Sequence, residues 1–239
     1  MSGYVVEEEM VEPQVRDGDT AETRVTLDAS AGSGVLEQRV VRFRAGRSQP
    51  QSLGERCGLL YVVSGRGTLI VGDKRYELEP EMGALVSAGE LFEVENPGPE
   101  VLLVVLVVAP QTDSSRPDPD RRTVRYAEQK PLPAGKDREF RYLVDSEVGC
   151  EDVTQFIGVI PPGRAPDHSH VYDEVLYVIE GRGLVHMGGE SHAIGPGSCL
   201  HLPPLFEHAL ENTTDAPMRV LGVFHPAGDP GSRAYEANE

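Results

Sequence analysis

The 239-residue sequence contains no tryptophan, 6% aromatic residues and only three cysteines. Cys57, Cys150 and Cys199 are far apart and form no closely spaced pairs, so the sequence predicts neither a disulfide framework nor a cysteine-rich metal site. Long apolar segments are also missing. The most apolar run, Val101 to Ala109, is too short to cross a bilayer as a helix.

Positive charge is scarce. The chain has 22 lysines and arginines against 39 aspartates and glutamates, which gives a net charge of −17. Nucleic acids and anionic membrane surfaces both require a basic face, so we expect neither as a partner. The acidic segment from Met1 to Met10 lacks a basic region followed by an apolar one, so no secretory signal is expected. Together these features predict a cytoplasmic protein whose partner is a small molecule.

Glycine and proline are abundant, with 26 and 19 residues. This composition is typical of many short strands joined by tight turns. An apolar run rich in β-branched residues at Leu59 to Val63 is followed by a turn, a short strand and a hairpin connection at Gly72-Asp73. The predicted fold class is therefore all-β.

The second half of the chain repeats the first at a shift of 116 positions. Pairs at this shift are Gly65 and Gly181, Gly72 and Gly188, Pro80 and Pro196, Asn96 and Asn212, and Pro110 and Pro226. A repeat of this length predicts two copies of one fold. We expect a tail or arm at 1–20, one barrel at 21–112, a linker at 113–127 and a second barrel at 128–239.

The segment from His168 to Glu174 contains the most distinctive chemistry. If Val175 to Ile179 is a strand, alternation places His168, His170 and Glu174 on one face, and His208 offers a fourth donor downstream. Neutral imidazoles with one carboxylate suit divalent Fe, Mn, Ni, Co or Zn and leave coordination positions open for water or substrate. The sequence does not identify which of these metals is bound.

The pattern Gly163-x4-His168-x-His170-x3-Glu174-x6-Gly181 resembles the first signature of the cupin superfamily, which normally has one more residue before its first histidine. The segment from Gly195 through His208-x3-Asn212 resembles the second signature. The resemblance implies two tandem jelly-roll barrels that form an intramolecular pseudo-dimer, a bicupin. It also implies a metal ion held by His168, His170, Glu174 and His208.

The first repeat lacks all four donors. At the shift of 116, His168 falls on Ser52, His170 on Gly54, Glu174 on Gly58 and His208 on Phe92. We therefore expect the N-terminal barrel to be a structural partner of the metal-binding C-terminal barrel. Binding of a ligand without metal in the first barrel remains an alternative.

His201 is the candidate catalytic residue. Leu200 and Leu202 flank it, so if both leucines pack outside the barrel, His201 points into the cavity and can carry protons or orient a metal ligand. The alternative is a hydrogen-bonded structural histidine. His192 is expected to be exposed, and His186 and His225 are weaker candidates.

Three functions fit these features. The favoured one is a metal-dependent oxidoreductase of the dioxygenase type that acts on a small oxygenated molecule, because cupins that this chain resembles include dioxygenases such as quercetinase. A second is Lewis-acid catalysis by a decarboxylase or isomerase, which needs an acid or base beside the metal. A third is a binding protein for a metal and a small carboxylate. The protein is expected to be a monomer or homodimer.

Overall fold

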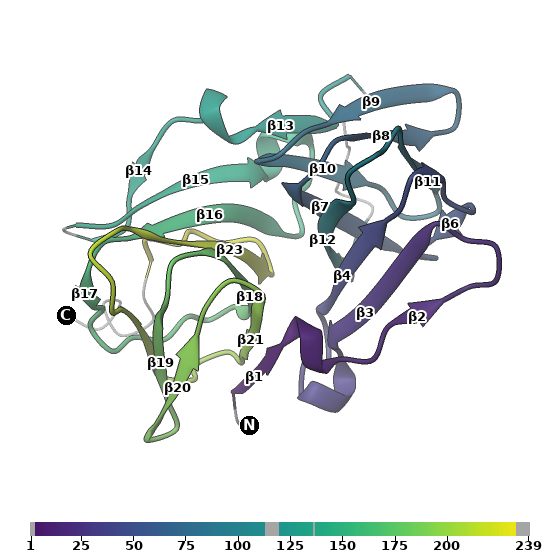
Figure 1. Ribbon diagram of the computed structural model, residues 1–239. Helices are drawn as coiled ribbons and strands as arrows, with labels where there is room; N and C mark the ends of the chain where they lie inside the picture. Colours follow the sequence, from purple (N-terminus) through teal and green to yellow (C-terminus); the bar gives the residue numbers. More distant parts are fainter. Residues whose placement is uncertain (1–2, 113–119, 136, 233–239) are drawn as a thin grey trace.

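The computed structural model describes residues 3–112, 120–135 and 137–232 and shows two β-barrels side by side (Figure 1). All strand pairs are antiparallel, as the all-β prediction requires. Four 3₁₀ turns interrupt the strands: η1 (Glu8–Met10), η2 (Ala29–Ala31), η3 (Tyr126–Glu128) and η4 (Ser146–Val148). Within the part of the chain that the structure describes, no helix is long and apolar enough to span a membrane.

The N-terminal barrel consists of a seven-stranded sheet, in the order β13-β10-β7-β12-β4-β3-β2, and a smaller sheet, β5-β11-β8-β9, with β6 also paired to β11. The bounds are β2 (Gln14–Val15), β3 (Ala21–Leu27), β4 (Glu37–Phe43), β5 (Gly46–Arg47), β6 (Gln51–Ser52), β7 (Arg56–Ser64), β8 (Gly67–Val71), β9 (Lys74–Leu78), β10 (Met82–Val86), β11 (Leu91–Asn96), β12 (Leu102–Pro110) and β13 (Thr123–Arg125).

The C-terminal barrel repeats this plan with a seven-stranded sheet, β1-β21-β18-β23-β16-β15-β14, and a four-stranded sheet, β17-β22-β19-β20. The bounds are β1 (Tyr4–Glu7), β14 (Leu132–Pro133), β15 (Glu139–Val144), β16 (Thr154–Ile160), β17 (Gly163–Arg164), β18 (Asp173–Glu180), β19 (Gly183–Met187), β20 (Glu190–Ile194), β21 (Ser198–Leu202), β22 (His208–Asn212) and β23 (Met218–His225). The two copies that the repeat predicts are thus present.

The two barrels exchange strands. β1 pairs with β21 of the C-terminal barrel, and β13 pairs with β10 of the N-terminal barrel. The N-terminal segment lies against the C-terminal barrel through β1, and Glu8 forms a 2.9 Å ion pair with Arg42 of β4. Of the expected linker, residues 113–119 lie outside the described residues, and Thr123–Arg125 form the strand β13.

The two large sheets pack face to face, and alternation along their strands divides the apolar residues between separate cores. In β7, Leu59 and Tyr61 join the cluster between the barrels, while Leu60 fills the interior of the N-terminal barrel. In β18, Val175 points to the interface and Leu176 to the interior of the C-terminal barrel. Each fully buried Leu or Val contributes about 1.5–3 kcal/mol. The pseudo-dimer is therefore one continuously packed unit.

Glycine permits the tight turns at the ends of these strands. Gly72 has a φ of 57° between β8 and β9, so the hairpin expected at Gly72-Asp73 is confirmed. Its counterpart between β19 and β20 has two such residues, Gly188 and Gly189.

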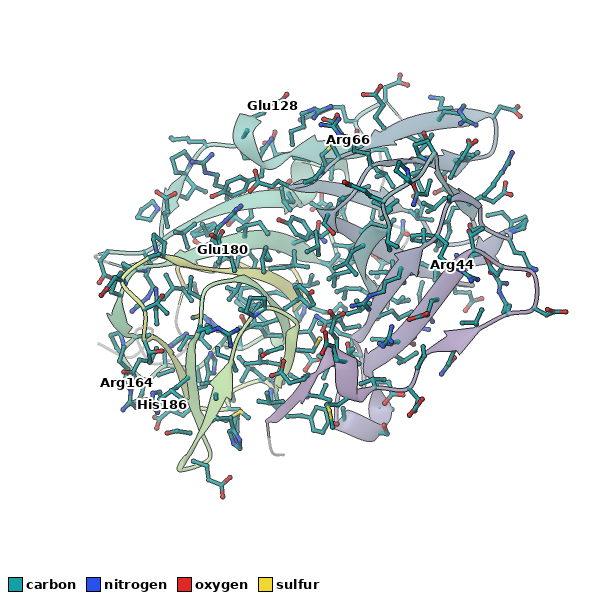
Figure 2. The ribbon with its side chains drawn as sticks, viewed as in Figure 1. Arg44, Arg66, Glu128, Arg164, Glu180 and His186 are labelled. Atoms are coloured by element: carbon teal, nitrogen blue, oxygen red, sulfur yellow. The ribbon has the colours of Figure 1, made fainter. Side chains whose placement is uncertain are left out.

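Charged side chains lie on the outside of both barrels, as the labelled Arg66, Glu128 and Glu180 show (Figure 2). Arg66 and Arg125 both pair with Glu79 across the surface of the N-terminal barrel. Such exposed pairs add little stability, with a median of about 0–1 kcal/mol each. The charged surface residues therefore interact mainly with water, and the stability of the fold comes from the buried cores.

Candidate metal centre

Three histidine side chains converge inside the C-terminal barrel. His168 lies in the loop after β17 and forms an isolated bridge with His208, the first residue of β22. Two backbone hydrogen bonds of 3.0 and 2.9 Å hold this bridge. One nitrogen each from His168, His170 and His208 lies within 4.8 Å of the others. The expected strand alternation does not explain how His168 and His170 meet, because β18 begins only at Asp173. The bridge joins His168 to His208, and the carbonyl of His170 accepts a 2.7 Å hydrogen bond from Leu205 N in the loop before β22.

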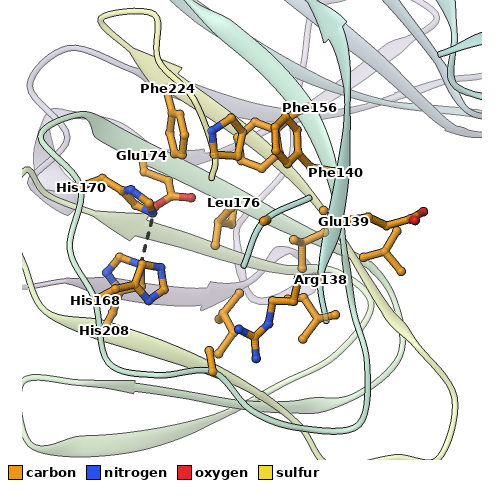
Figure 3. A pocket seen from close by; sticks show the side chains of 18 residues that line it. Arg138, Glu139, Phe140, Phe156, His168, His170, Glu174, Leu176, His208 and Phe224 are labelled. Atoms are coloured by element: carbon orange, nitrogen blue, oxygen red, sulfur yellow. Dashed lines mark ion pairs between the residues drawn. The ribbon is translucent and has the colours of Figure 1, made fainter. Parts of the chain in front are cut away.

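Glu174 enters the same space from β18. The even-numbered residues of β18 face the barrel interior, as Leu176 and Val178 do, and Glu174 follows the same alternation. Glu174 is 5% exposed, and its Oε2 lies 3.8 Å from Nε2 of His208 (Figure 3). That oxygen has no hydrogen-bond partner among the described residues. A buried carboxylate oxygen without a partner is costly, so a cation at this point would stabilise it.

Burial shifts the pKa values of both groups. Desolvation, with the nearby charge of Asp173, raises the pKa of Glu174 to about 8. Desolvation, with the neighbouring His168, lowers the pKa of His208 to about 3. His208 is thus a neutral imidazole at physiological pH, the form that binds metals.

The three rings are held in one tautomer by backbone carbonyls. Nδ1 of His168 donates to the Pro166 carbonyl at 3.0 Å, and Nδ1 of His208 donates to the Phe206 carbonyl at 2.9 Å. Nδ1 of His170 donates to the carbonyl of Ser232 at 2.8 Å. Since a carbonyl only accepts, each Nδ1 carries a proton, and in the neutral ring Nε2 keeps the lone pair that metal-ligating histidines require.

A cavity of about 90 Å³ adjoins these side chains. One water needs roughly 10–15 Å³ of such space, so several waters or a small ligand fit. Phe140, Phe156 and Phe224 form its aromatic wall, with ring centroids 6.2 and 4.9 Å apart along the row. Arg138 lines the side away from the histidines, and the carboxylate of Glu139 points outward (Figure 3). These residues were not foreseen, because alternation indicates burial and not which cavity a side chain faces.

The donor set fits a divalent metal ion. Three imidazole nitrogens fixed as acceptors and one buried carboxylate oxygen meet beside open space. Imidazole and carboxylate together suit Fe, Mn, Co, Ni and Zn and do not distinguish among them.

Side chains fill the equivalent place in the N-terminal barrel. Phe92 pairs with Val71 as His208 pairs with Met187, and its ring is 2% exposed within the apolar interior. At Gly58, the counterpart of Glu174, an added Cβ would lie 2.5 Å from Leu53 and 2.9 Å from Leu106. This barrel therefore has the packing expected of a structural partner.

His201 does not line the cavity, which corrects the sequence-based expectation. Leu200 and Leu202 belong to the interior of the C-terminal barrel, so the residue between them points the opposite way, toward the interface. Nε2 of His201 donates to Oδ1 of Asp173 at 2.7 Å, and Oδ2 of Asp173 accepts from Ser33 of the other barrel at 3.4 Å. His201 therefore forms its side-chain hydrogen bond at the interface between the barrels and not in the cavity.

The remaining histidines also lie outside the cavity. His186 sits on the outer sheet, where it bonds Glu211 at 2.7 Å and Ser191 at 2.8 Å (Figure 2). His192, expected to be exposed, is only partly so, with 40% of its side chain accessible. His225 ends β23 and is half-buried.

A family model described as "Cupin domain" matches residues 39–109 and 156–224, which together make up more than half of the chain. The chain belongs to the cupin family. Because the model matches twice and each match coincides with one barrel, the protein is a bicupin. Among curated proteins, the bicupin is 32% identical over 70 residues to the uncharacterized protein MJ1618 of Methanocaldococcus jannaschii. That match covers 28% of the chain and 56% of the archaeal protein.

Solved structures share the fold at low sequence identity. The protein Ylba from E. coli matches with a TM-score of 0.78 and 14% identity, over 94% of this bicupin and 90% of that chain. A 7S globulin of Momordica charantia matches at 0.73 and 17%, over 94% and 84%. A variant of the oxalate decarboxylase of Bacillus subtilis matches at 0.74 and 14%, over 96% and 79%. Proteins with quite different names thus share one architecture, so the function of this chain has to be inferred from its site.

Proposed function

We propose that the C-terminal barrel binds one divalent metal ion through His168, His170, Glu174 and His208, and that the bicupin is an enzyme for a small oxygenated organic molecule. The observation that supports this most directly is the oxygen of Glu174 that has no hydrogen-bond partner in the part of the chain that the structure describes, beside three oriented imidazoles at the edge of a cavity. A group of donors needed only for packing would not leave a buried carboxylate oxygen unpaired next to open space.

The cavity walls indicate how a substrate would be held. The phenylalanine row offers an apolar face that excludes water and packs against a hydrocarbon or aromatic body. Arg138 places a positive charge on the other side, where it attracts an anionic or electron-rich oxygen. The substrate class we infer is a small molecule with an apolar body and several oxygen atoms.

The reaction type we favour is dioxygenation. When bound, a redox-active ion such as iron(II) or manganese(II) supplies open positions where an oxygen-rich substrate and dioxygen can meet. Outside the proposed ligands, the ionisable groups among the cavity-lining residues are Arg138 and Glu139. Glu139 points outward and lies 3.9 Å from Arg141, and His201 is outside the cavity. The described part of the cavity wall thus offers few groups for proton transfer, which suits oxygen chemistry better than acid–base chemistry.

Lewis-acid decarboxylation or isomerisation is the second candidate, and Arg138 is the observation in its favour. A guanidinium in the cavity wall matches a carboxylate in geometry and charge. The fold of the oxalate decarboxylase is compatible with this alternative and does not decide it, since 14% identity carries the architecture alone.

Oxygen uptake by iron- or manganese-loaded protein tests the choice, with a panel of enediols, phenols, β-diketones and small hydroxy acids. The His170→Ala variant, loaded in the same way, is the control for free metal. Uptake by the wild type alone supports dioxygenation. Turnover that persists without oxygen supports the Lewis-acid reaction, and tight binding of panel members without turnover supports a binding protein. Failure of the wild type to retain a divalent ion would refute the metal centre itself.

A further inference from the structure

The chain beyond β23 folds back onto the proposed metal centre. We call residues 226–232 the C-terminal strap. Pro230 lines the cavity, and the carbonyl of Ser232 accepts the 2.8 Å hydrogen bond from Nδ1 of His170. This segment has no strand of its own, so side-chain and turn contacts hold it in place.

The proposed histidine ligands differ in where their orienting carbonyls come from. His168 and His208 each bond a carbonyl two residues earlier in their own loops, at Pro166 and Phe206. His170 bonds a carbonyl 62 residues later in the chain. Two rings are therefore oriented by local loop geometry, whereas the third depends on tertiary placement of the strap.

Specific contacts fix the strap against the barrel. The amide of Gly228 donates to Oγ1 of Thr154 at 3.0 Å. A turn follows, in which Ser232 N donates to the Asp229 carbonyl at 3.0 Å and Gly231 N donates to Oδ1 of Asp229 at 2.7 Å. This turn sets the direction of the Ser232 carbonyl, because both bonds close the loop that leads to it.

Gly228 also lies directly against the ring of Tyr172. A Cβ added at Gly228 would lie 2.2 Å from Cζ of that ring, closer than van der Waals contact allows. Tyr172 in turn is nearly parallel to the ring of His170, at 6.0 Å and 21°, and to Phe224, at 4.9 Å and 27°. A glycine at this position lets the strap, Tyr172 and His170 stack as successive layers.

We infer that the C-terminal strap is a positioning element of the metal centre: through the Ser232 carbonyl it holds His170 in its metal-binding tautomer and orientation. This inference rests on the proposed metal site. Partners that hold the second nitrogen of a ligating histidine typically change metal affinity by about 10–100-fold when removed. Loss of the strap contact should therefore weaken metal binding by about that factor without unfolding either barrel.

The first test keeps the full chain. Gly228→Ala forces the strap away from Tyr172, and Gly34→Ala is the matched control, because a Cβ at Gly34 meets nothing within 4 Å. The affinity for Co(II), measured by competition with a chelator, should fall about 10–100-fold in the first variant and stay unchanged in the second. The visible spectrum of bound Co(II) should also change in Gly228→Ala alone, since it reports the ligand set and not overall stability.

Two shortened chains isolate the carbonyl. A chain ending at residue 231 lacks the Ser232 carbonyl, whereas one ending at residue 233 keeps it within a peptide bond. We expect weakened Co(II) binding and an altered spectrum in the first and wild-type behaviour in the second. Equal affinity and equal spectra for the Gly228→Ala, 1–231 and wild-type proteins would overturn the inference and leave the metal centre intact. Absence of Co(II) binding by the wild type would instead overturn the proposed function.

Discussion

Gln38 of the N-terminal barrel donates its side-chain amide to the backbone carbonyl of Leu176 in the C-terminal barrel, at 3.3 Å. The pseudo-symmetry repeats the contact: Gln155 donates to the carbonyl of Leu60 at 3.5 Å. Both glutamines are fully buried. Polar side chains at the centre of an apolar interface favour one register of the two sheets, because a shift would leave each buried amide without its carbonyl.

These two glutamines should not contribute equally to stability. Oε1 of Gln38 also accepts from Thr26 at 3.2 Å, whereas Oε1 of Gln155 has no hydrogen-bond partner among the described residues. Gln38→Met removes the donor to the Leu176 carbonyl and the side-chain acceptor of Thr26, which keeps its 3.1 Å bond to the main-chain carbonyl of residue 38. This change should lower the free energy of unfolding by about 1–3 kcal/mol. Gln155→Met should cost less. Urea denaturation of both variants measures the difference, and equal or reversed losses would contradict the assigned bonds.

The proposed ligands can be tested by metal content. His170→Ala or Glu174→Ala removes a donor and should reduce metal affinity by more than the ~10–100-fold that loss of an orienting partner costs. Ser52→Ala, at the position equivalent to His168, is the control in the first barrel. Gly58 is unsuitable for that purpose because its Cβ would clash with Leu53. Elemental analysis after purification should find metal in the control alone; retention by either donor variant would refute its assignment.

Glu174 makes the stability of the metal-free protein depend on pH. Its folded pKa, about 8, lies above the ordinary value of 4.5, so between these values the native state binds more protons than the unfolded chain. The stabilising contribution of the protonated carboxyl is therefore complete below pH 4.5 and is lost as the pH rises to about 8. Urea midpoints of chelator-treated wild type should fall between about pH 5 and 8.5 by more than those of Glu174→Gln. Parallel pH profiles would show that this carboxyl is not desolvated.

His201 should matter for stability and not for the metal site. The hydrogen bond between His201 and Asp173 is buried, because their side chains are only 1% and 9% exposed. His201→Ala removes the 2.7 Å donor to Oδ1 of Asp173 and leaves the buried carboxylate with only the 3.4 Å bond from Ser33, which should cost about 3 kcal/mol in unfolding free energy. Metal content should stay at the wild-type level, as in the exposed control His192→Ala. A loss of metal or activity at unchanged stability would restore His201 to a role in the site.

The sequence by itself determined the repeat and the all-β class and indicated the four proposed donors, because glycines, prolines and histidines at fixed spacings constrain local backbone and ligand chemistry. It also identified the barrel that lacks donors, since Phe92 stands where His208 stands in the other copy. Local patterns of this kind survive in any correctly paired sheet.

Only the tertiary structure decided which face of β21 meets the cavity, which strands are exchanged and what orients His170. Alternation divides a strand into two faces and does not say which face is the interior, so Leu200 and His201 could be assigned only once the sheets were packed. The exchanged strands β1 and β13 and the bond from His170 to Ser232 join residues far apart in sequence. Such contacts follow from the packing of whole barrels, on which local sequence has little influence.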